Sequence, residues 1–196
     1  WEIVCPVSFR HKGLPARIAS ATCGQDWVDR VEIVHWDMCA PADRLTLQAL
    51  GNVGVMLNVA SESHVDRSIT DPSAFIVNNT ALVINALELA RVLRPRLFLQ
   101  MSTDEVYGPA YGDHRHAEWE TIAPSNPYAA SKAAQEAICF SYWRTFGVPV
   151  VITNTMNIIG EQQDPEKFVP MIMRNLLHDL PITVHCDEAG RPGSRH

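Results

Sequence analysis

Residues 96–108 read RLFLQMSTDEVYG, an apolar run followed directly by polar residues. Its first half, Arg96–Met101, is a short apolar run typical of a buried strand in a parallel sheet that is covered on both faces. Its second half places a hydroxyl and two neighbouring carboxyl groups, Thr103, Asp104 and Glu105, directly after that strand. Parallel sheets bind their ligands at the carboxyl ends of strands, so these side chains are candidates for a functional site. A solvated turn is the plain alternative.

Similar apolar runs predict four further strands. They are Glu2–Cys5, Val31–His35, Val53–Val59 and Val148–Thr153. Longer segments with helical periodicity lie between them. The predicted helices are Ser73–Leu93 after an Asp71 cap and Pro72, a helix from Asn126 to Phe146 that Gly147 ends, and a third helix capped by Asp164–Pro165.

This alternation predicts an α/β fold: a doubly wound, Rossmann-like parallel sheet with helices on both faces. The alternation loosens after Thr153. We therefore expect residues 1–153 to form a dinucleotide-binding domain and residues 154–196 to begin a substrate-binding lobe.

Composition excludes several classes of protein. The 196 residues are 46% hydrophobic and 19% charged, with a net charge of −6 and no basic run, so a nucleic-acid partner is not expected. No run of about 18 uninterrupted apolar residues predicts a membrane span. The five cysteines are widely spread without CxxC spacing. We therefore expect no zinc knuckle, no other metal site and no disulfide framework, and a cytoplasmic location.

Tyr128 and Lys132 stand four residues apart near the start of a predicted helix, so their side chains share one face. A nearby ammonium and the helix dipole favour the phenolate, which predicts that Tyr128 can accept a proton. This spacing is common on surface helices and carries little weight alone. The Thr103–Glu105 segment about 20 residues earlier gives it weight.

Three strings carry a family resemblance: SESHVDRSI at 61–69, STDEVYG at 102–108 and PYAASK at 127–132. With PEKFVP at 165–170, they closely resemble the nucleotide-sugar 4,6-dehydratases of the extended short-chain dehydrogenase/reductase superfamily. The resemblance covers about residues 31–180. It implies a lyase that converts dTDP-glucose, or a similar nucleotide-sugar, to the 4-keto-6-deoxy sugar by oxidation at C4, loss of water across C5 and C6 and hydride return to C6. It also implies NAD as the cofactor and a homodimer formed through the helices at 73–93 and 127–146.

The resemblance implies a role for each catalytic candidate. Tyr128 takes the 4-hydroxyl proton, while Lys132 lowers its pKa and holds the nicotinamide ribose. Thr103 binds the sugar 4-oxygen, Glu105 removes the C5 proton and Asp104 protonates the departing 6-hydroxyl. Elimination needs an acid and a base together, whereas an epimerase needs only the tyrosine and the cofactor. The neighbouring acids therefore favour a dehydratase.

Binding residues are implied in the same way. The cofactor contacts are Asp37, Met38, Val59, Ala60, Ser61, Tyr128 and Lys132. The substrate contacts are Ser63, Thr103, Asn157, Lys167 and Phe168. Several of these have ordinary structural explanations as loop caps, strand ends, surface lysines or core residues.

The sequence departs from the family pattern in several places. No GxxGxxG turn occurs in it, so we expect the first strand and its glycine-rich turn to be lacking, with their place before Trp1. Val7 stands where an acid is expected, and the basic residues at 10–12 could receive a 2′-phosphate, which keeps NADP possible. Asn154 replaces an arginine, and 157–160 read NIIG in place of NNYG. The alternatives are an NADP-using GDP-mannose-type dehydratase, an epimerase, and a non-catalytic Rossmann-like binding protein that has lost its cofactor turn.

Overall fold

The structure is a computed structural model, and it describes residues 1–9, 15–184 and 186. Its strands are β1 (Ile3–Val7), β2 (Val31–His35), β3 (Val55–Asn58), β4 (Leu97–Thr103) and β5 (Val150–Thr155). Its helices are α1 (Pro15–Thr22), α2 (Arg44–Leu50), α3 (Val65–Thr70), α4 (Pro72–Leu93), α5 (Pro127–Phe146) and α6 (Phe168–Leu177), with short 3-10 turns η1 (Val28–Arg30) and η2 (Asp104–Tyr107). All five predicted strands form. The basic residues at 10–12 and the segment 190–196 lie outside the described residues.

The strands are parallel, and they form two separate ladders. β1 pairs with β2, and β3, β4 and β5 pair in that order. A Rossmann sheet has the strand order 3-2-1-4-5-6. If β1 to β5 are strands two to six of that order, the break between β1 and β3 falls where strand one would lie. The topology thus confirms a Rossmann-like sheet that lacks its first strand among the described residues.

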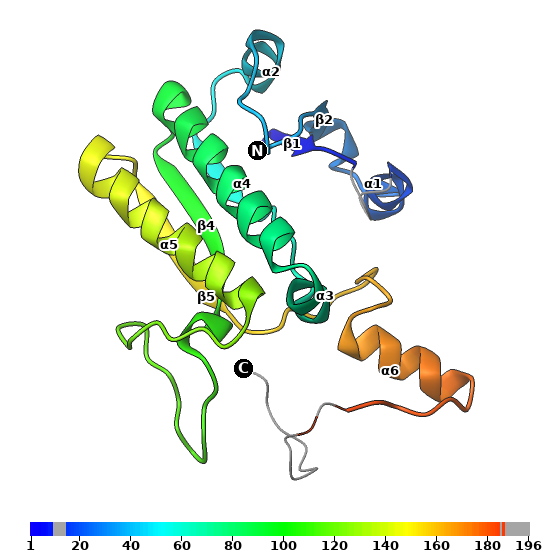
Figure 1. The fold of residues 1–196 in the computed structure, drawn as a ribbon. Coiled ribbons are helices and arrows are strands. Elements are labelled where there is room, and N and C mark those ends of the chain that lie inside the picture. The colour runs from blue at the N-terminus through cyan, green and yellow to red at the C-terminus, as the bar shows by residue number, and fades with distance from the viewer. Residues whose placement is uncertain (10–14, 185, 187–196) are drawn as a thin grey trace.

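Helices α4 and α5 lie side by side over one face of the β3–β4–β5 ladder (Figure 1). Met56, Phe98 and Val150 form a row on that face and pack beneath the helices. The next row, Leu57, Leu99 and Val151, faces the other way, and Leu57 is 64% exposed. Among the described residues, α4 and α5 cover one face of this ladder. The apolar strands still carry the residues that a second layer would bury.

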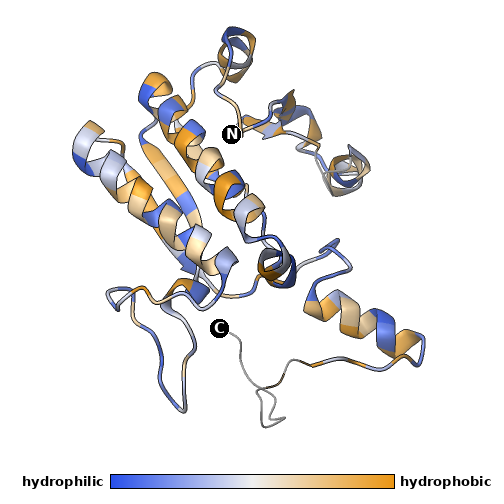
Figure 2. Ribbon diagram, viewed as in Figure 1, coloured by the Kyte–Doolittle hydropathy of each residue, from blue (hydrophilic) through white to orange (hydrophobic). Residues whose placement is uncertain are grey.

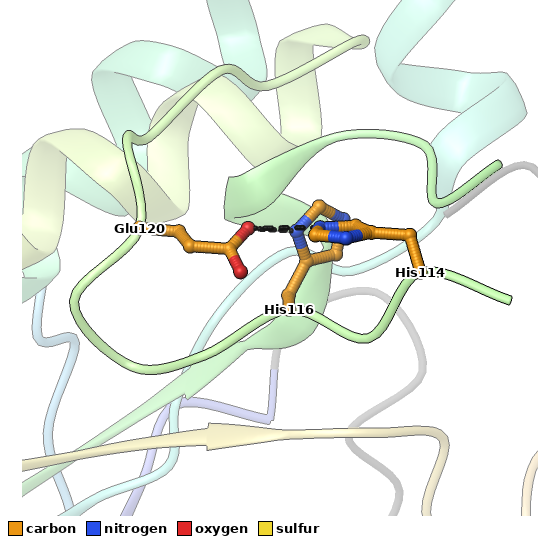
Figure 3. A group of neighbouring side chains, drawn as sticks. All are labelled: His114, His116 and Glu120. Carbon is orange, nitrogen blue, oxygen red and sulfur yellow. Dashed lines mark hydrogen bonds and ion pairs between the residues drawn. The ribbon is translucent and has the colours of Figure 1, made fainter.

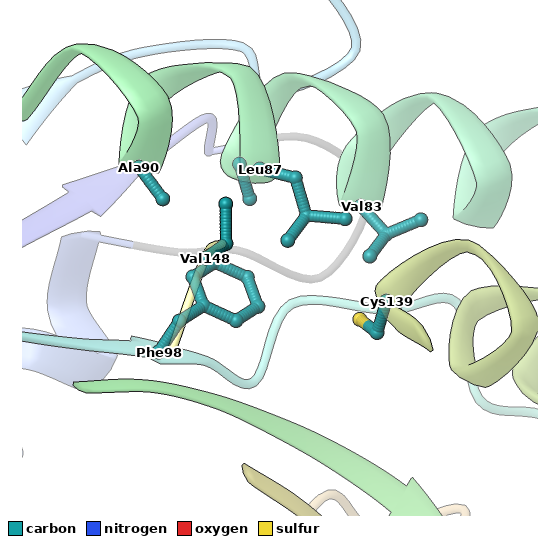
Figure 4. Packing of buried hydrophobic residues seen from close by; sticks show 7 residues of the cluster. Val83, Leu87, Ala90, Phe98, Cys139 and Val148 are labelled. Atoms are coloured by element: carbon teal, nitrogen blue, oxygen red, sulfur yellow. The ribbon is translucent and has the colours of Figure 1, made fainter. Parts of the chain in front are cut away.

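The main core lies between α4, α5 and the sheet (Figure 4). Its fully buried members are Val83, Ala86, Leu87, Ala90, Phe98, Cys139 and Val148. Hydrophobic residues run along both α4 and β4 in Figure 2. By length and composition, α4 is the one helix in the described part of the chain that could cross a membrane, but its buried side chains pack on the sheet and α5 as those of a core helix do.

The predicted helix caps are confirmed at Asp71, Asn126 and Gly147, and one predicted cap is wrong. Asp71 accepts from Ala74 N at 3.3 Å, Asn126 accepts from Ala129 N at 2.8 Å, and Gly147 ends α5 with a positive φ of 71°. The predicted Asp164–Pro165 cap is wrong, because α6 begins at Phe168 and Asp164 instead closes the preceding turn through bonds from Glu166 N and Lys167 N. The predicted domain boundary after residue 153 falls inside β5, and the division itself stays a prediction.

Buried side-chain amides connect the strands to the helices, and we call this set the amide network: Asn58, Asn79, Gln100 and Gln135. Asn58 Nδ2 donates to Gln100 Oε1 at 2.7 Å, and Gln100 Nε2 donates to Gln135 Oε1 at 3.0 Å. Gln135 Nε2 donates to the backbone carbonyl oxygen of Asn79 at 2.7 Å. Asn79 in turn bonds both backbone groups of Glu62 and donates to Ser131 Oγ at 2.8 Å. The network therefore joins β3, β4, α5 and α4 to the loop that follows β3.

Asn79→Ala should lower the free energy of unfolding by about 3 kcal/mol, because it leaves several buried polar partners unsatisfied and each costs about 1–3 kcal/mol. Urea unfolding followed by circular dichroism measures this change. Asn52→Ala, at an exposed position before β3, is the matched control and should change the stability by less than about 0.5 kcal/mol. Equal stability of the two variants would show that the Asn79 side chain contributes nothing to stability.

Candidate active site

The carboxyl end of β4 turns directly into η2, and Thr103 organises that turn. Its hydroxyl oxygen accepts from Glu105 N at 3.3 Å and donates to Asp104 Oδ1 at 3.2 Å. Thr103 is buried, while Asp104 and Glu105 are half-buried. One hydroxyl thus sets the positions of two neighbouring carboxyl groups at the end of the strand.

The start of α5 lies against this turn. Asn126 Nδ2 donates to Glu105 Oε2 at 3.0 Å, and Tyr128 N donates to Ser68 Oγ of α3 at 3.2 Å. The Tyr128 hydroxyl shares a hydrogen bond with Thr103. The structure therefore brings Thr103, Asp104, Glu105 and Tyr128 into one cluster, as the sequence predicted.

Tyr128 does not have the lowered pKa that the sequence predicted. Burial, followed by the charge of Glu105, raises the pKa of Tyr128 to about 12, although the bond with Thr103 opposes this shift. The pKa is raised because the tyrosine lies beside two acids in a buried position, and the role predicted for Lys132 stays a prediction. Lys132 is not among the groups that shift it.

The Lys132 side chain points toward β4. Its Nζ donates to the Met101 carbonyl oxygen at 2.6 Å. Burial lowers the pKa of Lys132 to about 8, and the charge of Glu136 opposes that shift. Glu136 is itself buried one turn further along α5, where the same carboxylate oxygen accepts from Ser102 Oγ and from Asn154 Nδ2. The lysine is thus held in a desolvated position opposite a buried carboxyl group.

The candidate cofactor residues follow the ends of β2 and β3. Asp37 lies after β2, where its Oδ1 accepts from Cys39 N at 3.1 Å, and the Met38 carbonyl oxygen accepts from Asn85 of α4. Val59 and Ala60 are exposed after β3, and Ser61 is half-buried. These residues and Lys132 all lie at the carboxyl ends of parallel strands or beside them.

Two of the candidate substrate residues meet. Lys167 Nζ donates to the Ser63 carbonyl oxygen and to Ser63 Oγ, each at 3.2 Å. Phe168 is 55% exposed at the first position of α6, and Asn157 is exposed in the loop after β5. The segment before α6 also contacts the start of α3, where Glu166 Oε2 lies 3.6 Å from His64 Nε2. These contacts link residues 154–184 to the first part of the chain.

Sequence reasoning missed three supports of the site. Ser68 lies inside the SESHVDRSI string, but its bond to the backbone of Tyr128 depends on how α3 and α5 pack. Asn126 was recognised as a helix cap and not as a partner of Glu105. Glu136 follows Lys132 at helical spacing, which is a signal that periodicity alone could have supplied.

Gly108 ends η2 in a conformation that requires glycine. Its φ is +83°, and a Cβ there would collide with the carbonyl oxygen of Ala123. A second contact closes the same loop, because Ala123 N donates to the Val106 carbonyl oxygen at 2.9 Å. The chain therefore leaves β4 and returns to the same point before it enters α5.

Comparison with known proteins places this geometry in a class. The chain belongs to the NAD dependent epimerase/dehydratase family, whose sequence pattern matches residues 2–191. It is 36% identical over 161 residues to a dTDP-glucose 4,6-dehydratase of Neisseria meningitidis, which covers 77% of this chain and 45% of that protein. The chain spans about half the length of the curated relatives that it matches.

Solved structures agree with this assignment. The crystal structure of DesIV, a dTDP-glucose 4,6-dehydratase from Streptomyces venezuelae with NAD bound, superimposes with a TM-score of 0.84 at 33% identity, over 96% of this chain and 56% of that one. A UDP-glucuronic acid 4-epimerase from Bacillus cereus has a TM-score of 0.82 over 95% of this chain and 58% of that one. At 23% identity, the epimerase shows a shared fold alone.

Lys132 should make stability depend on pH in a defined window. Between about pH 8 and pH 10.5 the folded lysine is largely neutral while the unfolded one still binds a proton, so stability rises with pH there. Relative to Lys132→Met, the wild-type protein should gain about 2–3 kcal/mol across this window, since each pKa unit corresponds to about 1.4 kcal/mol. Urea unfolding at a series of pH values measures the difference.

The comparison with Lys132→Met removes an opposing effect. Burial raises the pKa of Cys139 to about 12, so that thiol lowers stability as the pH rises above 9 in both proteins. A difference between wild type and variant that stays constant from pH 7.5 to 10.5 would contradict a desolvated Lys132.

Proposed function

We propose that this chain forms the catalytic core of a nucleotide-sugar 4,6-dehydratase that acts on dTDP-glucose or a closely similar nucleotide diphosphate hexose. The observation that carries the proposal is the pair of acids, Asp104 and Glu105, hydrogen-bonded into one cluster with Thr103 and Tyr128. Curated relatives at 34–39% identity that are named dTDP-glucose 4,6-dehydratase support it.

The chain's own residues divide the proton transfers among them. Thr103 binds the 4-oxygen of the sugar, and Tyr128 takes the proton of the 4-hydroxyl. Glu105, oriented by Asn126, removes the proton at C5, and Asp104 gives a proton to the departing 6-hydroxyl. Two neighbouring carboxyl groups can serve as base and acid when their surroundings differ. Here Glu105 accepts from an amide, whereas Asp104 accepts from a hydroxyl.

Tyr128 needs help to act as a base, because burial and the neighbouring acids raise its pKa. Lys132 is the cationic side chain on the same face of α5, and its bond to Met101 holds it one helical turn away. We assign it to lowering the pKa of Tyr128 and holding the nicotinamide ribose once the ligands are in place.

NAD fits the two ends of the proposed cofactor site. Asp37 and Met38 would hold the adenine, Val59, Ala60 and Ser61 would line the path of the ribose and pyrophosphate, and Tyr128 with Lys132 would meet the nicotinamide ribose. The chemistry supplied by NAD would be a hydride acceptor at C4 and a hydride donor at C6. The buried Asn58 Oδ1 has no partner within the described residues, which supports a further polar group beside β3. The glycine-rich turn that would cradle the pyrophosphate is not in this sequence.

The nucleotide end of the substrate is assigned to the second lobe, which we place at residues 154–196. The Ser63–Lys167 pair offers a cation and a hydroxyl to the diphosphate, and the exposed ring of Phe168 offers a stacking surface to the base. Asn157 completes this set from the loop after β5.

Turnover tests the proposal directly. The protein, supplied with NAD, should convert dTDP-glucose to a 4-keto-6-deoxy sugar, detected by its alkaline absorbance. Glu105→Gln should slow product formation at least about 100-fold, since a positioned general base contributes about 10²–10⁴-fold. Glu32→Gln, at an exposed position on β2, is the matched control and should turn over normally.

Two results would contradict the proposal. One is the absence of product from any hexose nucleotide although cofactor binds. The other is equal turnover by Glu105→Gln and the control.

We also assign the protein to the cytoplasm and to a homodimer formed through α4 and α5. All five cysteines are free, as in a reducing compartment. The two helices expose large apolar side chains: Ile76, Val77, Ile84, Phe140 and Trp143. Exposed apolar residues concentrated on two adjacent helices are typical of an interface.

Light scattering tests the dimer. The wild-type protein should have twice the monomer mass, and Val77→Glu should shift it toward the monomer because it places a charge in the interface. Leu45→Glu on α2 is the control, since it introduces the same charge at an equally exposed site. A monomeric wild-type protein would overturn the assignment.

A further inference from the structure

The loop between η2 and α5 brings together His114, His116 and Glu120 (Figure 3). Glu120 Oε2 lies 3.1 Å from His114 Nε2 and 2.7 Å from His116 Nδ1. One ligand atom from each residue lies within 4.8 Å of the other two. Cysteine spacing gave no reason to expect a metal site, and it overlooks this HxHxxxE pattern.

The second nitrogen of His116 fixes its tautomer. Nε2 lies 3.2 Å from the Gly108 carbonyl oxygen, which can only accept, so Nε2 carries a hydrogen. In a neutral imidazole, Nδ1 then presents its lone pair beside a carboxylate oxygen, and this is the form that binds a metal ion, whereas in an imidazolium Nδ1 donates to that oxygen instead. Metal-binding histidines use this arrangement, with the outer N–H donating to a backbone carbonyl.

The carboxylate is oriented as well. Ala117 N donates to Glu120 Oε1 at 2.9 Å, which leaves Oε2 facing the two imidazoles. The His116 ring also stacks on Tyr107 at 5.5 Å between centroids, which fixes the imidazole on the rigid end of η2.

We propose that His114, His116 and Glu120 form a three-ligand site for a divalent metal ion of the zinc class. Two imidazole nitrogens and one carboxylate oxygen suit Zn²⁺ and leave a fourth position for water, whereas Mg²⁺ and Ca²⁺ prefer oxygen ligands alone. The bound ion joins the two ends of the segment 114–120 and anchors it, through Gly108 and Tyr107, to η2. The site is independent of the proposed dehydratase activity.

Zinc binding tests the proposal. The protein, stripped of metal with EDTA and dialysed, is titrated with ZnCl₂ in a calorimeter at a fixed neutral pH, with MgCl₂ in a parallel titration. We expect one equivalent of zinc to bind, no heat from magnesium, and a zinc-dependent rise in the melting temperature.

Variants assign the ligands. His114→Gln and Glu120→Gln should each weaken zinc binding by at least about 100-fold, because even loss of an outer-shell partner costs 10–100-fold. Neither should bind enough zinc to raise its melting temperature. His114 is exposed, so its substitution should leave the fold intact, and unchanged circular dichroism checks this. His178→Gln, outside the cluster, is the control and should bind zinc as the wild type does.

Two outcomes overturn the proposal. One is the absence of zinc binding to the wild-type protein. The other is equal zinc affinity in wild type, His114→Gln and Glu120→Gln, which would place the ion elsewhere.

Discussion

The amide network of Asn58, Asn79, Gln100 and Gln135 determines how α4 and α5 are placed on the β3–β4–β5 ladder. An apolar core packs well in many registers, whereas a buried amide has to find its donors and acceptors in one. Because Asn79 bonds both backbone groups of Glu62, the loop after β3 is tied to α4. Because Gln135 bonds Asn79 and Gln100, α5 is tied to α4 and β4. The network thus fixes the position of α5 along the sheet. It thereby also fixes the position of Tyr128 relative to the end of β4.

Burial sets the charge states of the site. The same desolvation that raises the pKa of Tyr128 lowers that of Lys132, so both groups are pushed toward their neutral forms. Charging either group inside the site therefore costs free energy, and a bound ligand of opposite charge would lower that cost. Glu136 matters here because its buried carboxyl group faces the lysine from the same helix, held by Ser102 and Asn154 from two strands. Asn154, which departs from the family pattern, therefore takes part in the electrostatics of the site.

The strands and long helices could be predicted because their signals are local: apolar runs for β2 and β4, and Asp71, Asn126 and Gly147 at helix ends. The gathering of Thr103, Glu105 and Tyr128 followed from strand-end logic together with the family resemblance. Charge states could not be predicted, because they depend on burial among residues distant in sequence. The start of α6 was misplaced because Asp164 can cap a turn as readily as a helix. The cover of the second face of β3–β5 could not be predicted, because apolar strands show what must be buried and not what buries it.

The closure at Gly108 and Ala123 has a consequence for how this protein can evolve. Since the chain returns to its starting point before entering α5, residues 109–122 form a closed loop whose two ends are held by the framework. The free energy of closing such a loop changes slowly with its length. Insertions, deletions and new side chains can therefore accumulate there without moving Tyr128. The loop is thus a place where related proteins can acquire separate ligands or partners while the chemistry beside it stays the same.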